Sequence, residues 1–200
     1  NRTGFFVGRK DVIKGIKEYI QGKNSQPLVI WGSSGSGKST LMAKAILDAQ
    51  RFFPKFKVIY RFIGTTPESS NGRDLLENLL HQLINTGNGD ENNIPTSYND
   101  LAREFEKTLA KVAKRKPILL FLDALDQLED TDEALNFAWL PNNLPSNVKI
   151  ILSSISGPCL EKLCLKIPAI QQIELKSLSM ADGKTLLNQW RIGARRTLQS

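Results

Sequence analysis

The residues from Gly32 to Ser39 have the types and the spacing that bind a phosphate chain. They read Gly-Ser-Ser-Gly-Ser-Gly-Lys-Ser and match the pattern G-x-x-x-x-G-K-[ST] without a mismatch. Glycines let the backbone turn tightly and present successive N–H groups, and a helix that starts after them adds its positive end. We expect Lys38 to hold the β- and γ-phosphates and Ser39 to bind Mg²⁺. The nucleotide-binding residues expected from this loop are Gly32, Ser33, Ser34, Gly35, Ser36, Gly37, Lys38, Ser39 and Thr40.

Two aspartates further along the chain are candidate partners of this loop. The apolar run Ile118–Leu122 leads into Asp123, and a carboxylate at the end of a buried strand can hold the Mg²⁺ of a bound nucleotide. Asp126 follows three residues later and is the carboxylate available to orient or deprotonate an attacking water. The catalytic candidates are Lys38, Asp123 and Asp126, and the candidate metal ligands are Ser39 and Asp123. Alternatively, Asp123 caps a turn and Asp126 belongs to a solvated acidic turn.

Short apolar strands alternate with helical patterns along the chain. Strands are expected at Leu28–Trp31, Phe56–Ile63, Ile118–Leu122, Val148–Ser153 and Gln171–Leu175, and helices at 10–21, Lys38–Gln50, Arg73–Asn85 and from about Leu101 to before Pro117. Continuously apolar strands separated by helices are typical of a parallel sheet covered on both faces. The sequence therefore predicts an α/β fold, a three-layer α/β/α sandwich with a five-stranded parallel sheet.

The last expected strand sets the domain boundary. Residues 1–177 are predicted to form the nucleoside triphosphatase (NTPase) domain. Residues 178–200 have no following strand and are predicted to begin a helical lid or linker, with a helix from about Ser179 that is cut short. The polar stretch Thr86–Ser97, rich in glycine and asparagine, is the expected mobile insertion loop.

Four segments resemble the signal-transducing (STAND) NTPases, in particular their NACHT branch. Asp123–Leu128 resembles the second acidic motif of that family, in which a small residue follows the Mg²⁺ aspartate. Phe6–Arg9 resembles the segment that opens these domains and packs near the adenine. Arg61–Ser70 is similar to NACHT proteins that carry WD or TPR repeats, of the nephrocystin-3 and telomerase-associated-protein types. Leu144–Ser154 resembles their strand with the sensor position.

The resemblance implies an ATP-dependent switch, bound to ADP and closed at rest, then bound to ATP and assembled into oligomers. Slow, Mg²⁺-dependent ATP hydrolysis would control this self-association and signalling within a larger protein that carries effector and repeat domains. The resemblance also assigns adenine binding to Phe6, Val7, Gly8 and Arg9. A solvated N-terminal arm is the alternative for Arg9.

Two positions depart from the family pattern. Many relatives end the sensor strand in Thr-Ser-Arg, whereas Ser153-Ser154-Ile155 has no arginine, which puts γ-phosphate sensing from that strand in doubt. Gln127 stands where many relatives have an acidic residue, which indicates slow turnover. A nucleotide-bound scaffold without turnover is therefore an alternative function.

The charge of the chain raises a second class of partner. Lys and Arg total 27 against 20 Asp and Glu, a net charge of +7. Residues 1–60 carry a balance of +8 and residues 61–140 a balance of −6. Basic side chains gather around the first helix and at 111–116, and a solvated face is the interpretation we favour for both. Nucleic acid is thus not an expected partner, although a nucleic-acid-associated AAA-like ATPase stays an alternative.

Other classes lack their sequence signals. The longest apolar run, Ile118–Leu122, is far shorter than the ~20 residues of a membrane-spanning helix, so no membrane partner is expected. The two cysteines and the single histidine do not supply a zinc site, and two free thiols indicate a reducing compartment, so we expect a cytoplasmic protein. Guanine recognition is disfavoured because no Asn-Lys-x-Asp segment occurs, and an ABC-type subunit because no Leu-Ser-Gly-Gly-Gln-like run occurs.

Overall fold

The computed structural model describes residues 9–65, 67–87, 89, 94–131, 134–177 and 183–184 of the chain. Its strands are β1 (Leu28–Trp31), β2 (Lys57–Phe62), β3 (Ile118–Asp123), β4 (Val148–Ser154) and β5 (Gln171–Glu174). Its helices are α1 (Lys10–Gln21), α2 (Lys38–Phe52), α3 (Gly72–Gly87), α4 (Tyr98–Ala113) and α5 (Pro158–Lys166), with short 3₁₀ turns η1 (Pro67–Ser70), η3 (Leu125–Gln127) and η4 (Ala134–Asn136).

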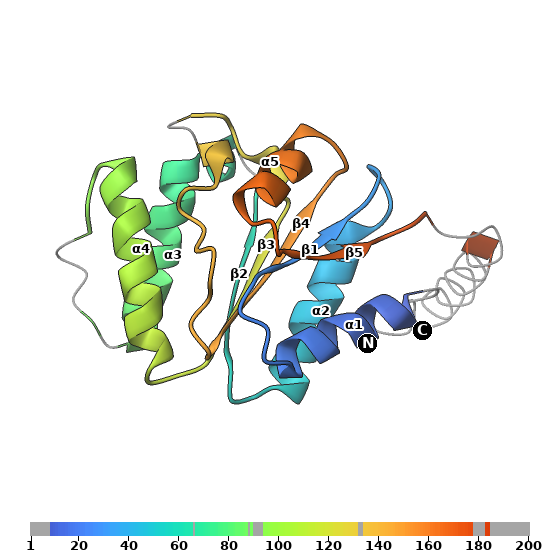
Figure 1. The fold of residues 1–200 in the computed structure, drawn as a ribbon, viewed down its shortest axis with the longest axis horizontal. Helices are drawn as coiled ribbons and strands as arrows, with labels where there is room; N and C mark the ends of the chain where they lie inside the picture. The colour runs from blue at the N-terminus through green and yellow to red at the C-terminus, as the bar shows by residue number, and fades with distance from the viewer. Residues whose placement is uncertain are drawn as a thin grey trace, which may run out of the picture.

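The five strands form one parallel sheet in the order β2-β3-β4-β1-β5 (Figure 1). Strand β4 lies between β1, which leads into the glycine-rich loop, and β3, which ends at Asp123. All carboxyl ends therefore meet at the same edge of the sheet, where ligands of open α/β sheets bind. The topology brings the residues singled out by the sequence to that edge.

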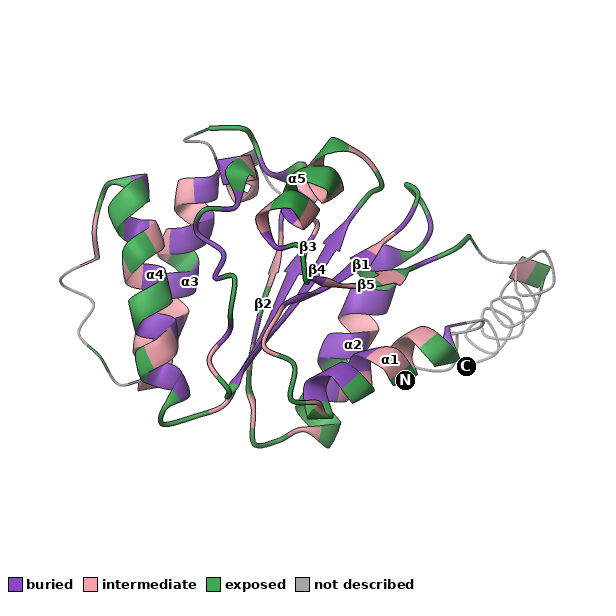
Figure 2. Ribbon diagram, viewed as in Figure 1, coloured by how far each residue is buried: buried purple, intermediate pink, exposed green. Residues whose placement is uncertain are grey.

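Helices cover both faces of the sheet, and alternate residues of β3 show how the two layers divide. Leu120 and Leu122 pack in the larger core, against α3, α4 and α5. Leu119 and Phe121 pack in the second core, against α1 and α2. The central strands are buried on both sides, and exposed residues lie on the outer helix faces (Figure 2). The predicted three-layer α/β/α sandwich with five parallel strands is confirmed.

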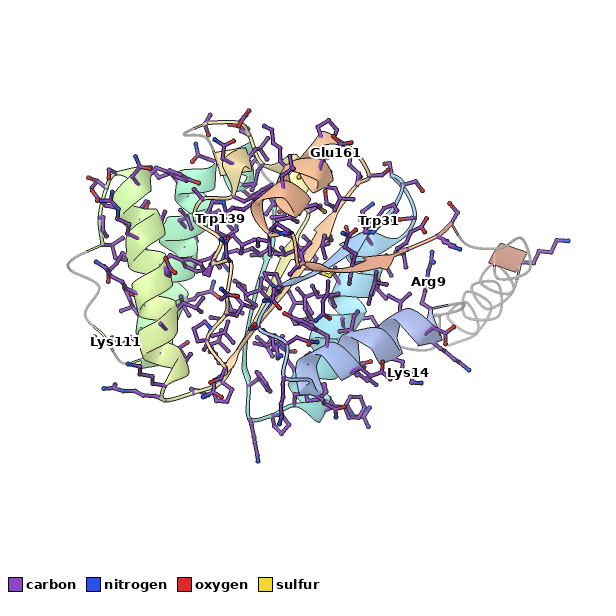
Figure 3. The ribbon with its side chains drawn as sticks, in the orientation of Figure 1. Arg9, Lys14, Trp31, Lys111, Trp139 and Glu161 are labelled. Atoms are coloured by element: carbon purple, nitrogen blue, oxygen red, sulfur yellow. The ribbon has the colours of Figure 1, made fainter. Side chains whose placement is uncertain are left out.

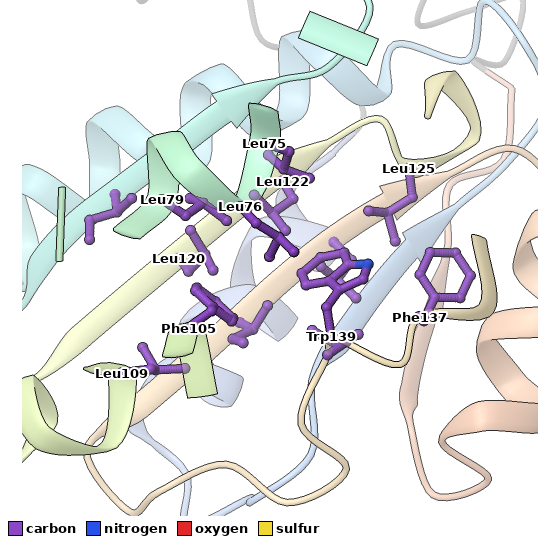
Figure 4. Close-up of a cluster of buried hydrophobic side chains, with 14 of the residues drawn as sticks. Leu75, Leu76, Leu79, Phe105, Leu109, Leu120, Leu122, Leu125, Phe137 and Trp139 are labelled. Atoms are coloured by element: carbon purple, nitrogen blue, oxygen red, sulfur yellow. The ribbon is translucent and has the colours of Figure 1, made fainter. Parts of the chain in front are cut away.

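The larger core is built from leucines and aromatic rings. Figure 4 shows Phe105 of α4 beside leucines of α3 and β3, with Trp139 close to Phe137. The rings of Phe105 and Trp139 meet edge to face, with centroids 6.1 Å apart. The Trp139 indole N–H donates to the Ala134 carbonyl at 3.2 Å, which satisfies its one polar group. This layer holds β3 in place from the side opposite α2.

Two local features differ from the sequence prediction, and a third expectation is left untested. Helix α5 was not predicted, although Gly157 at φ 138° and Pro158 in the first turn mark its start. Helix α3 continues to Gly87, so the expected loop Thr86–Ser97 begins two residues later, because the Thr86 hydroxyl donates back to the Gln82 carbonyl. The expected C-terminal helix lies outside the described residues, apart from residues 183 and 184. Among the described helices, none is both long and apolar enough to span a membrane.

Candidate functional site

The glycine-rich loop connects β1 to α2, and its backbone conformation requires glycine at several positions. Gly35 and Gly37 have φ angles of 73° and 90°, and a Cβ at either position would meet no atom within 4 Å. Gly32 is required for a different reason: a Cβ there would lie 2.4 Å from the Leu175 carbonyl oxygen. Because α2 begins at Lys38, its first N–H groups open onto the loop.

Lys38 is buried in the loop with only 7% of its surface exposed. Its ammonium donates to the carbonyl oxygens of Gly32 at 2.8 Å and Ser33 at 3.0 Å. Burial lowers the pKa of Lys38, and the nearby charges of Asp126 and Asp123 oppose that shift. Both predicted carboxylates therefore lie close enough to Lys38 to interact with it, so the fold unites the three catalytic candidates.

Asp123 ends β3 and is 4% exposed. The Ser153 hydroxyl, at the end of β4, donates to its Oδ1 atom. A buried carboxylate held by one hydroxyl retains lone pairs for a metal ion or a metal-bound water. The interpretation of Asp123 as a simple turn cap is not supported, because the bond that the structure shows runs to the neighbouring strand.

Asp126 is half-buried in η3, and both of its carboxylate oxygens accept hydrogen bonds. Oδ1 accepts from the Ile155 backbone N–H at 2.9 Å, and Oδ2 accepts from the Gln127 side-chain amide at 2.8 Å. These bonds fix the carboxylate next to the end of β4. Asp126 is thus an oriented group and not part of a fully solvated turn, whereas Glu129 and Asp130 beyond it are exposed.

The loop residues fit a phosphate chain. The Ser36 hydroxyl is buried and has no hydrogen-bond partner among the described residues, and such a group needs an acceptor or donor. On the same loop Ser33, Ser34, Gly35 and Gly37 are exposed, and so are Ser39 and Thr40 in the first turn of α2. A triphosphate would offer acceptors for these N–H and hydroxyl groups, and Ser39 with Asp123 would hold its Mg²⁺. The individual roles of these residues stay predictions.

The segment expected to contact the adenine is described only at Arg9, since Phe6, Val7 and Gly8 lie outside the described residues. Arg9 is buried and its guanidinium donates to the carbonyl oxygens of Ser36 and Lys176. The interpretation of Arg9 as a solvated arm is therefore wrong, because its side chain is buried and bonded to the loop and to the residues after β5. The basic residues Lys10, Lys14 and Lys23 are exposed, as a solvated face requires.

Sequence reasoning missed how the neighbouring loops support the acidic motif. The Glu129 N–H donates to the Ser70 carbonyl at 2.9 Å, and the Ser70 hydroxyl donates to Glu129 Oε1 at 3.1 Å. Gly64, at φ 74°, lets Gln127 approach so closely that a Cβ on this glycine would lie 2.8 Å from Gln127 Cβ. The loop after β2 thus packs on the loop after β3. Only the glycine offered a signal in the sequence.

A glycine-rich loop between a central parallel strand and a helix, with its lysine facing aspartates of a nearby strand, defines a P-loop NTPase domain. Residues 6–152 match the family model described as the AAA ATPase domain, and the chain belongs to that family. Nucleotide binding is the property that this family and this loop share.

Comparison with curated proteins finds relatives with NACHT domains. The chain is 35% identical over 159 residues to NACHT and WD repeat domain-containing protein 2 of Mus musculus, covering 74% of this chain and 9% of that protein. It is 30% identical to NACHT domain- and WD repeat-containing protein 1 of Homo sapiens, covering 96% and 13%. It is 27% identical over 164 residues to nephrocystin-3 of Xenopus laevis, covering 81% and 12%. The chain thus spans about a tenth of these relatives.

Solved structures show the same fold at low identity. The Aeropyrum pernix ORC1 protein, solved in complex with DNA, matches with a TM-score of 0.61 at 13% identity, covering 92% of this chain and 49% of that chain. The Aeropyrum pernix ORC2 protein, solved as ADPNP–ADP complexes, matches with a TM-score of 0.61 at 15% identity, covering 94% and 54%. These likenesses establish the α/β fold of P-loop ATPases for this chain.

Proposed function

We propose that this domain is a nucleotide switch of the STAND type, which binds ATP and ADP with Mg²⁺ and hydrolyses ATP slowly. The observation that carries the proposal is that the start of α2, the end of β3 and η3 bring Lys38, Asp123 and Asp126 to one sheet edge. Three groups with these charges match the needs of a Mg²⁺-bound triphosphate: a cation for the phosphates, a metal ligand and a water-orienting carboxylate.

The roles follow from the positions of the groups. Lys38 exchanges its bonds to Gly32 and Ser33 for bonds to phosphate oxygens. Asp126 orients the attacking water, whose oxygen bonds to the γ-phosphorus while the bond from that phosphorus to the β–γ bridging oxygen breaks. The proton of the water passes to Asp126 or to a phosphate oxygen, and the products are ADP and phosphate. Mg²⁺ on Ser39 and Asp123 would neutralise phosphate charge.

The residue next to Asp126, Gln127, supports slow turnover of ATP. Gln127 donates its amide to Asp126 Oδ2, so it occupies a lone pair of that carboxylate and supplies no second base. Relatives named for WD repeats support a place in a larger protein, in which residues 1–177 are the NTPase domain and 178–200 begin a lid. In that setting we propose that nucleotide exchange and hydrolysis control self-association and signalling. Cys159 and Cys164 are free thiols, which supports a cytoplasmic location.

The test of turnover is release of phosphate from Mg²⁺-ATP by the purified domain. We expect slow release that falls at least tenfold in Lys38→Ala and in Asp126→Asn. Asp130→Asn is the matched control, because Asp130 is an exposed carboxylate four residues away that pairs with Lys162. The proposal of turnover fails if no variant changes the rate. Copurified ADP without phosphate release would favour the nucleotide-bound scaffold.

The test of the switch is the molar mass in solution with each nucleotide. Light scattering should show a monomer with ADP and a larger species with a non-hydrolysable ATP analogue, and Lys38→Ala should stay monomeric with both. The same mass with both nucleotides in the wild-type domain would contradict self-association by this domain alone.

A further inference from the structure

Arg9 is a buried cation that the proposed chemistry does not use directly. It lies immediately before α1 and is 8% exposed. Its Nη2 donates to the carbonyl oxygen of Ser36 at 2.7 Å, inside the glycine-rich loop. Its Nη1 donates to the carbonyl oxygen of Lys176 at 2.5 Å, just after β5. One guanidinium therefore joins segments that are 27 and 167 residues away along the chain.

The chain that leaves β5 also supports the start of the loop. The Leu175 N–H donates to the Trp31 carbonyl at 2.6 Å, and a Cβ on Gly32 would lie 2.4 Å from the Leu175 carbonyl oxygen. The start of the loop thus packs against Leu175, and Ser36 near its end is bonded by Arg9, which also bonds Lys176. Both supports lead back to the two residues that follow β5.

The bond to Ser36 fixes the direction of a peptide plane in the loop. In a trans peptide the C=O and N–H point in opposite directions, so anchoring the Ser36 oxygen on Arg9 directs the Gly37 N–H to the other side of the loop. Gly37 has a left-handed φ of 90° and has no side chain that could restrain its backbone. The guanidinium is well suited to this task because it is permanently charged and offers donors in a rigid fork.

We propose that Arg9 is a positioning residue, which braces the phosphate-binding loop against the exit of β5 and sets nucleotide affinity through the loop backbone. Its guanidinium acts at the phosphate end of the ligand and does not read the base. This proposal rests on the proposed function, since it needs a nucleotide in the loop. It changes the role that the sequence assigned to Arg9 among the adenine-binding residues.

The experiment compares ligands that share the phosphates but differ in the base. The affinities of Mg²⁺-ATP, Mg²⁺-ITP and base-free Mg²⁺-tripolyphosphate are measured by competition with a fluorescent ATP analogue. For Arg9→Gln we expect all three to weaken by the same factor, on the order of tenfold, so that the ATP:ITP ratio is unchanged. Arg9→Lys should lose less, because one ammonium keeps a charged donor but cannot span both carbonyls as a fork does.

Lys14→Gln is the matched control, because it removes a cation from α1, the helix that Arg9 precedes, at a side chain that is 76% exposed. Figure 3 shows Arg9 and Lys14 on different sides of α1. This control should bind like the wild type. Thermal melting of the ligand-free variants reports folding, and Arg9→Lys provides a folded variant if Arg9→Gln is unstable.

Two results would overturn the positioning role of Arg9 while leaving the proposed function of the domain intact. One is unchanged affinity in both Arg9 variants. The other is a loss for ATP that leaves tripolyphosphate binding unaffected, which would place Arg9 on the base. Failure of the wild-type domain to bind any of the ligands would instead overturn the proposed function. The positioning role of Arg9 would then fail as well.

Discussion

Two buried lysines lie at opposite edges of the sheet. Each donates hydrogen bonds to two backbone carbonyls, but the two differ in function. Lys38 is 7% exposed and donates to two carbonyls at the carboxyl edge. Lys149, near the start of β4, is 3% exposed and donates to the Gly22 and Asn24 carbonyls at 2.8 and 2.7 Å. Burial lowers the pKa of both. The difference is that Asp123 and Asp126 face Lys38, whereas the ring of Tyr19 lies beneath Lys149.

The comparison separates a cation that holds the fold together from one that is available for chemistry. Lys149 ties the turn after α1 to β4, and Tyr19 reinforces the connection by bonding the Ile150 backbone through its hydroxyl. Lys38 is bound to its own loop, on carbonyls that lie only five and six residues away. Its bonds can therefore be exchanged for phosphate bonds without separating two elements.

The largest expected effect is the loss of nucleotide affinity in Lys38→Met. The variant lacks the cation for the phosphates, so we expect Mg²⁺-ATP to bind at least ~100-fold more weakly. The free energy of unfolding should fall by less than in Lys149→Met, because the bonds from Lys38 to Gly32 and Ser33 stay within one loop and join no distant elements. Urea unfolding and a binding titration on the same sample measure both. A stability loss larger than the binding loss would give Lys38 a structural role.

Lys149→Met should show the opposite pattern. The bonds from Lys149 to the Gly22 and Asn24 carbonyls join the turn after α1 to β4, and methionine cannot replace them, so we expect a loss of about 2 kcal/mol in the free energy of unfolding. Nucleotide affinity of the folded protein should equal that of the wild type. Lys111→Met, at an exposed position of α4, is the control for removal of a charge. Weak ATP binding by folded Lys149→Met would contradict the distinction between a structural Lys149 and a nucleotide-binding Lys38.

Ser153→Ala tests the support behind the acidic side of the site. The Ser153 hydroxyl orients Asp123, and the loss of such a supporting hydrogen bond typically costs about tenfold in metal affinity. We expect the Mg²⁺ concentration for half-maximal ATP hydrolysis to rise by roughly that factor, with affinity for metal-free ATP unchanged. Ser154→Ala is the neighbouring control, since its hydroxyl donates to the Ile155 carbonyl. An unchanged Mg²⁺ requirement in Ser153→Ala would show that Ser153 does not support Mg²⁺ binding.

The smallest effect is a pH dependence of stability at Lys149. Its pKa in the folded protein is lowered by burial, so at alkaline pH the unfolded chain, with a pKa of about 10.4, binds more protons. The resulting contribution to stability is complete above that unfolded pKa and is lost as the pH falls through the lowered folded pKa. The stability gap between wild type and Lys149→Met should therefore widen as the pH rises from the lowered folded pKa toward the unfolded value of about 10.4. A gap that narrows over this range would contradict burial as the cause.

The sequence predicted the Lys38 edge far better than the Lys149 edge, for a physical reason. The glycine-rich loop and its lysine are contiguous in the sequence. Apolar strands such as Ile118–Leu122 indicate the parallel sheet that brings Asp123 to the same edge. The partners of Lys149 are carbonyls 125 and 127 residues away, and any residue type has a carbonyl, so no pattern marks them. The same holds for Arg9 and its bonds to Ser36 and Lys176. Long-range bonds to backbone leave no residue type to recognise.

The central claim is that the carboxyl edge of the sheet binds Mg²⁺-ATP through Lys38, and calorimetric titration of the two lysine variants tests it most directly. We predict saturable binding of one nucleotide per chain by the wild type and by folded Lys149→Met, and no measurable binding by Lys38→Met under the same conditions. Equal binding by both variants, or binding lost only in Lys149→Met, would contradict the claim.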